Sequence, residues 1–100
     1  MATDVKIENK ISVSLKPPKL WKVVFHNDDQ TPMEFVIGLL MTIFKHNEEQ
    51  AKDITLEIHN SGYGVAGVYT HEIAEQKGLE STHISREKGY PLVITLEKDE

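Results

Sequence analysis

The sequence has no cysteine, fewer basic than acidic residues and no long apolar run. Without cysteine it forms neither a disulfide framework nor a thiolate metal site. Eleven basic residues against sixteen acidic ones give a formal net charge of −5. This charge argues against a general binder of nucleic acid or of anionic membranes, since both need a basic patch. No stretch approaches transmembrane length and no secretory pattern opens the chain, so we expect a soluble intracellular protein.

The 100 residues, 39% of them hydrophobic, are enough for one globular domain with a modest core. We expect a flexible N-terminal extension over residues 1–15, a stiff proline connector over 16–19, and a core domain over 20–100. Alternation and turn signals predict strands at 20–26, 63–69 and 92–97, and helices at 32–45, 47–59 and from about 71 onwards. The order β-α-α-β-α-β predicts an α+β fold, a three-stranded antiparallel sheet with helices on one face.

Capping signals mark the starts of the first two helices. Thr31 is a natural N-cap before Pro32, with Glu34 in the capping-box position. Asn47 has the same relation to Gln50.

Glycines raise three further expectations. Gly38, inside the first helix, suggests a close backbone contact, because glycine there costs about 1 kcal/mol relative to alanine. Gly78 predicts a break in the third helix. The small residues of 63–69 suggest close packing of that strand.

The character of the residues changes most sharply, from apolar to polar, between the predicted strand at 20–26 and the predicted helix at 32–45. Asn27, Asp28 and Asp29 follow the apolar strand directly, and Thr31 and Pro32 then start a helix. Polar side chains at such a junction can project from a rigid scaffold and form a binding site. Alternatively, they simply turn the chain and cap the helix.

Metal or acid–base chemistry at this place has little support in the sequence. The five histidines form no His-Glu-x-x-His motif. A metal-dependent hydrolase using His26, Asp28, Asp29 and His59 requires the fold to gather these four side chains. His59, near the end of the second helix, could equally well complement the helix dipole there.

Six segments together resemble the ClpS family of bacterial adaptors, and they extend over residues 16–97. They are Lys16-Pro17-Pro18, Trp21-Lys22-Val23, the run from Asn27 to Val36, Glu57-Ile58-His59, the run from Gly67 to Lys77, and Tyr90-Pro91-Leu92 with Thr95-Leu96-Glu97. The resemblance implies a binding module rather than an enzyme, with no cofactor. Such adaptors bind proteins whose first residue is Leu, Phe, Tyr or Trp with a free α-amino group (N-degrons), and deliver them to a Clp ATPase for degradation.

Carried over by position, the resemblance assigns the α-amino group to Asn27, Asp29 and His59, with Asp28 beside them. The chemistry suits this role, because an ammonium has three donors and needs several converging acceptors. Bonds of this kind, in which one partner is charged, are the stronger ones.

The resemblance also implies an apolar pocket for the first side chain, lined by Thr31, Met33, Val36, Thr55, Ile58 and Leu92. Met33 stands where the family has a gatekeeper against β-branched first residues. Thr55 stands where many relatives carry Met. This difference implies either a roomier pocket or a hydroxyl that can reach the tip of Tyr or Trp.

Glu72 and Lys77 match positions that contact the ATPase in the family, although without the resemblance both read as part of a solvated face. The implied partners are N-degron substrates and the N-terminal domain of a ClpA- or ClpC-type ATPase. We expect a monomer in the bacterial cytoplasm, without nucleic-acid or membrane partners. A ClpS-fold regulator of the ATPase that has lost degron binding is a further alternative.

Overall fold

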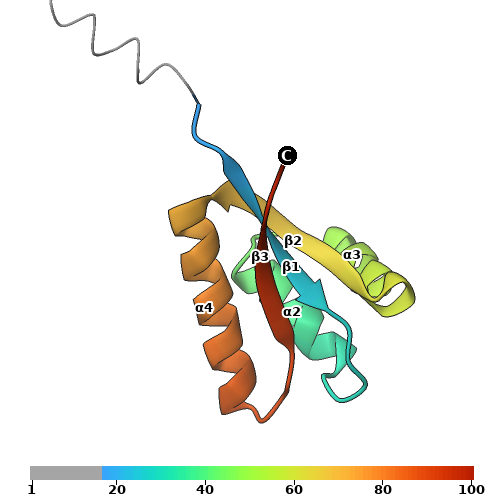
Figure 1. The fold of residues 1–100 in the computed structure, drawn as a ribbon. Helices are drawn as coiled ribbons and strands as arrows, with labels where there is room; N and C mark the ends of the chain where they lie inside the picture. The colour runs from blue at the N-terminus through green and yellow to red at the C-terminus, as the bar shows by residue number, and fades with distance from the viewer. Residues whose placement is uncertain (1–16) are drawn as a thin grey trace, which may run out of the picture.

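The computed structural model describes residues 17–100 and follows the predicted order of strands and helices (Figure 1). The elements are β1 (Leu20–His26), α2 (Met33–Thr42), α3 (Glu48–Ser61), β2 (Tyr63–Thr70), α4 (His71–Glu87) and β3 (Val93–Lys98). The predicted extension of residues 1–15 lies outside the described residues, as does the first residue of the connector. Residues 17–19 are exposed and belong to no helix or strand. The division between residues 19 and 20 stays a prediction.

The strands form one antiparallel sheet in the order β2-β1-β3, which confirms the predicted fold class. On β1, Val23 and Phe25 lie opposite Leu96 and Ile94 of β3 and point to the same face. The helices cover this face: the ring of Phe44, just after α2, meets that of Phe25 edge-on at 5.5 Å between centroids. The core therefore lies between the sheet and its three helices.

The two predicted helix caps have opposite outcomes. Asn47 forms the predicted capping box: its side chain accepts from the Gln50 backbone N–H at 2.8 Å, and the Gln50 side chain accepts from the Asn47 N–H at 3.2 Å. The Thr31 cap is wrong, because α2 starts at Met33 after Pro32 and has no side-chain cap. The Thr31 hydroxyl instead donates to Asp28 at 2.8 Å, which draws it away from the helix.

The first helix is shorter than predicted and the second slightly longer. α2 ends at Thr42, and Lys45 has a left-handed φ of 63°, so the chain turns sharply where the sequence pattern continued a helix. α3 continues to Ser61 and ends at Gly62, whose φ of 94° is the left-handed conformation that glycine favours at helix ends. Within residues 17–100, none of the helices is long and apolar enough to cross a membrane.

Two of the expectations for glycines are also wrong. α4 continues through Gly78, which is buried against β3: an added Cβ would lie 3.6 Å from Leu96 and 3.8 Å from Ile94. Glycine here allows α4 to approach the sheet closely and does not break the helix. A Cβ at Gly38 would meet no heavy atom of the described residues within 4 Å, so no close contact explains that glycine.

The close packing expected for 63–69 is present at Gly64, where an added Cβ would lie 2.7 Å from Ile58 Cγ1. We therefore expect Gly64→Ala to lower the free energy of unfolding by about 1–3 kcal/mol, because α3 and β2 must separate. Gly38→Ala is the matched control and should raise it by about 0.5–1 kcal/mol, since alanine is the better helix former. Urea denaturation of both variants measures this, and a Gly64→Ala midpoint at or above that of the parent protein would contradict it.

Candidate functional site

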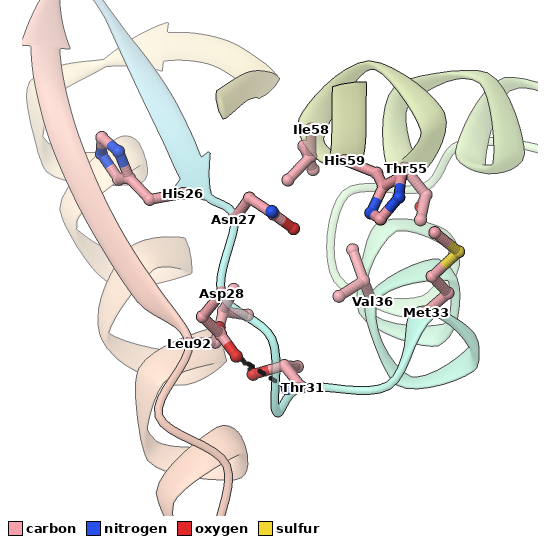
Figure 2. A pocket seen from close by; sticks show the side chains of 10 residues that line it. All are labelled: His26, Asn27, Asp28, Thr31, Met33, Val36, Thr55, Ile58, His59 and Leu92. Atoms are coloured by element: carbon pink, nitrogen blue, oxygen red, sulfur yellow. Dashed lines mark hydrogen bonds between the residues drawn. The ribbon is translucent and has the colours of Figure 1, made fainter. Parts of the chain in front are cut away.

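A hollow of about 270 Å³, including its open mouth, lies where the end of β1, the start of α2, the last turns of α3 and the segment before β3 meet (Figure 2). All six residues predicted for the side-chain pocket line it. The complete lining is His26, Asn27, Asp28, Thr31, Met33, Val36, Thr55, Ile58, His59 and Leu92. The fold thus brings together residues that lie up to 66 positions apart in the sequence, from 26 to 92.

A backbone hydrogen bond joins the two elements that carry the polar residues of the mouth. The Asn27 N–H donates to the Gly62 carbonyl at 2.8 Å, which ties the end of β1 to the end of α3. Asn27 and His59, both exposed, consequently flank the hollow from its two sides (Figure 2). An amide oxygen and a neutral imidazole nitrogen are both acceptors for an ammonium group.

Asp28 supplies a carboxylate at the same place and holds the loop in shape. Its Oδ1 accepts from the backbone N–H groups of Gln30 and Thr31 at 2.8 and 2.7 Å, and its Oδ2 accepts from the Thr31 hydroxyl. Burial raises the pKa of Asp28, but these three hydrogen bonds and the positive charge of Arg86 together lower it below 3.8. The carboxylate is therefore ionised at neutral pH and has lone pairs left for a cationic ligand.

Asp29 is separated from these groups. It is exposed and is not among the residues that line the hollow. Successive side chains point in different directions, and here Asp28 faces the hollow. Of the four residues predicted for the amino group, the structure brings Asn27, Asp28 and His59 to the hollow and leaves Asp29 outside.

The depth of the hollow is apolar and its mouth is partly open. Val36, Ile58 and Leu92 are buried and belong to the hydrophobic core. Met33, at the first turn of α2, is 40% exposed and stands at the mouth (Figure 2). Floor and walls are therefore fixed by the packing of the core, and Met33 is the partly exposed residue at the mouth.

The structure also bears on the two readings of Thr55. Its hydroxyl is buried and donates to the Ala51 carbonyl one turn earlier in α3, at 2.8 Å. The hydroxyl proton is thus used within the helix, as is usual for threonine in helices. The Thr55 oxygen can still accept from the N–H of Trp or the O–H of Tyr, so the hydroxyl is available to a first side chain only as an acceptor.

His26 lines the hollow but was considered from the sequence only as a metal ligand. Its Nε2 lies 2.8 Å from the Thr95 hydroxyl oxygen on β3. The available signal was its place directly before Asn27, at the end of a strand that must present its last residues to the site. Within residues 17–100 no three His, Asp or Glu side chains gather as metal ligands, so the fold does not bring His26, Asp28, Asp29 and His59 together in the way that a metal site requires.

The two residues predicted to contact an ATPase lie on α4, away from the hollow. Glu72 is exposed in the first turn. Lys77 is half-buried: its Nζ donates to the Ile43 carbonyl at 2.7 Å and lies 5.4 Å from the centre of the Tyr69 ring. Lys77 therefore braces the end of α2 against α4, so Glu72 is the more accessible of the two.

Comparisons with known proteins agree with this geometry. Residues 16–95 match the family described as ATP-dependent Clp protease adaptor protein ClpS. The chain is 47% identical over 91 residues to the ATP-dependent Clp protease adapter protein ClpS of Shewanella denitrificans, covering 91% of this chain and 89% of the relative. The structure of Agrobacterium tumefaciens ClpS2 bound to L-phenylalaninamide is 38% identical, with a TM-score of 0.80 over 83% of this chain and all of that one. The chain therefore belongs to the ClpS family of Clp protease adaptor proteins.

Proposed function

We propose that this protein binds substrates that begin with Leu, Phe, Tyr or Trp and carry a free α-amino group, and delivers them to a Clp ATPase for degradation. The observation that carries the proposal is the pairing of an apolar depth with polar acceptors at the mouth of one hollow. Val36, Ile58 and Leu92 offer the apolar surface, and Asn27, Asp28 and His59 the acceptors. Only the first residue of a chain presents a side chain and an ammonium on the same Cα.

The apolar part of the hollow is formed by Val36 of α2, Ile58 of α3 and Leu92 just before β3, so it can surround a single side chain from three elements. Burying one Leu or Phe side chain contributes about 1.5–3 kcal/mol. The relative from Agrobacterium tumefaciens binds L-phenylalaninamide, which combines an apolar side chain with an α-amino group. The same chemistry supports the proposal for this chain.

We further infer that the partner is the N-terminal domain of a ClpA- or ClpC-type ATPase, contacted through the exposed Glu72 on α4. Lys77 takes part in this surface mainly by holding α4 against the end of α2. The protein acts in the bacterial cytoplasm as a monomer, and binds rather than catalyses.

Fluorescence anisotropy with labelled peptides that start with Phe, Leu, Tyr or Trp tests the proposal. We expect binding that acetylation of the peptide N-terminus abolishes, because acetylation removes the ammonium charge. Equal binding of free and acetylated peptides would refute the recognition of the amino group. If no peptide binds while the ATPase domain still does, the protein is instead a regulator of the ATPase without degron binding.

Met33 at the mouth predicts discrimination against β-branched first residues, since a branch at Cβ clashes there. Met33→Ala should improve the binding of Ile- and Val-starting peptides by about 1 kcal/mol, the lower end of the cost of overpacking. Met41→Ala is the control, because Met41 lies on the same helix, is 37% exposed and does not line the hollow. The same anisotropy assay measures both variants. Unchanged discrimination in Met33→Ala would show that Met33 is not the gate.

A further inference from the structure

We propose that Arg86 is a positioning residue for the first-residue pocket: from the last turn of α4 it fixes the backbone that carries Leu92 and so sets the shape of the pocket's deep end. The inference rests on the proposed function and deepens it. It concerns a residue that does not line the hollow itself. Arg86 is also the single arginine of the sequence.

The contacts of Arg86 are directed at one short segment. Its Nη1 donates to the Tyr90 carbonyl at 3.0 Å and to the Leu92 carbonyl at 2.8 Å. These two carbonyls flank Pro91, in the segment that joins α4 to β3. One guanidinium nitrogen therefore holds both ends of the turn that enters β3.

This segment has few other means of holding its shape. Pro91 has no N–H and donates no backbone bond. The Tyr90 N–H donates to the Ser85 carbonyl at 2.9 Å, and the Tyr90 ring meets Phe35 edge-on at 4.9 Å between centroids. Both contacts act before Pro91, whereas the Arg86 bond acts on the carbonyl of Leu92 itself, between Pro91 and the sheet pairing that begins at Val93.

The placement of Leu92 matters because it belongs to the core and to the pocket at once. Its side chain is buried among core residues and lines the hollow from the side of β3 (Figure 2). A ring from Phe or Trp reaches further into the hollow than the shorter Leu side chain. Loosening the Leu92 backbone should consequently weaken aromatic first residues more than Leu.

Arg86→Met removes the two donors and keeps an unbranched apolar stem. We expect the dissociation constant of a Phe-starting peptide to rise about tenfold, and that of a Leu-starting peptide to rise threefold or less. Lys88→Met is the matched control, since Lys88 is an exposed cation two residues further on, and it should leave both constants unchanged. A melting curve of each variant confirms that it is folded.

A general loss of folded protein lowers the binding of all peptides by the same factor, so the ratio of the two constants separates positioning from mere stability. An unchanged Phe-to-Leu ratio in Arg86→Met would overturn the inference, with or without a loss of affinity. If Arg86→Met does not fold, Arg86→Lys, whose reach is shorter, is judged by the same ratio. The unmodified protein is measured first: if it binds no Phe-starting peptide, the proposed function fails, whereas binding with an unchanged ratio in the variant refutes the role of Arg86 alone.

Discussion

Asp28→Asn should weaken the binding of Phe-starting peptides by about 1.5–3 kcal/mol, the usual contribution of a hydrogen bond to a charged group. This is roughly a ten- to hundredfold rise in the dissociation constant, at 1.4 kcal/mol per factor of ten. The reason is that Asp28 supplies the negative charge among the residues that line the hollow. A peptide ammonium that enters an apolar hollow gives up water, and a neutral amide compensates that loss poorly.

Asparagine is the informative substitution because it separates charge from structure. Its Oδ1 can still accept from the N–H groups of Gln30 and Thr31, which now bond to the Asp28 carboxylate. Its Nδ2 can donate to the Thr31 hydroxyl, which now donates to Asp28. The loop therefore keeps its bonds while the negative charge is lost.

Asp29→Asn is the matched control, since it removes the same charge from the neighbouring residue. Asp29 is exposed and lies outside the lining of the hollow, so we expect a loss below about 0.5 kcal/mol. Anisotropy titrations at low and at physiological salt measure both variants. An equal or larger loss in Asp29→Asn would place the amino group at Asp29, as the family resemblance implied.

The lowered pKa of Asp28 also makes the stability of the fold depend on pH. Burial opposes the charged form, but the hydrogen bonds of the loop and the charge of Arg86 outweigh it, so the folded state holds the proton less tightly than the unfolded state. The resulting stabilisation is present above the ordinary pKa of 3.8 and is lost as the pH falls through the lowered pKa. Asp28→Asn should accordingly flatten the decline of stability in acid.

The parts of the fold that local chemistry decides were predictable from the sequence. Alternation predicted β1 with its observed bounds, Leu20–His26, and the Asn47 box marked the start of α3. The Thr31 cap failed because the Asp28 carboxylate, only three residues earlier, accepts from its hydroxyl, and the capping pattern does not distinguish these two partners. The helix break predicted at Gly78 is absent, because this glycine is buried where α4 packs against β3, and local sequence does not predict that packing.

In the site, the family motifs predicted which residues lie together, and single hydrogen bonds decided the details that the motifs do not state. The six residues that the family resemblance predicts for a side-chain pocket are all among those that line the hollow, because their motifs stand in the sequence as written. It assigned the amino group to Asp29 with Asp28 beside it, whereas Asp28 is the carboxylate that lines the hollow, because of the turn that Asp28 forms with Thr31. The hydrogen bond from Arg86 to the Leu92 carbonyl was not predicted either, because no sequence pattern links the end of a helix to the floor of a pocket.

Leu92→Ala should lower the free energy of unfolding by about 2–5 kcal/mol, which is the cost of truncating a core leucine. Leu92 is 1% exposed and packs in the core cluster. For a domain of this size each kcal/mol shifts the melting temperature by about 4–8 °C. Because the same side chain lines the hollow, peptide affinity should fall together with stability.

Val93→Ala provides the comparison for Leu92→Ala, since Val93 is the next residue and 49% exposed, on the sheet face opposite the helices. It should cost less than about 1 kcal/mol of stability, and it removes no wall of the pocket.

Leu92→Met, which nearly conserves volume, should cost less than about 1.5 kcal/mol and leave a folded protein whose pocket floor is altered. Thermal unfolding measures the stability of the three variants, and peptide titration measures their affinity. A Leu92→Met variant with parental stability and an unaltered profile of first-residue preference would show that Leu92 serves the core and not the pocket, because a wall that touches the ligand changes selectivity when its shape changes.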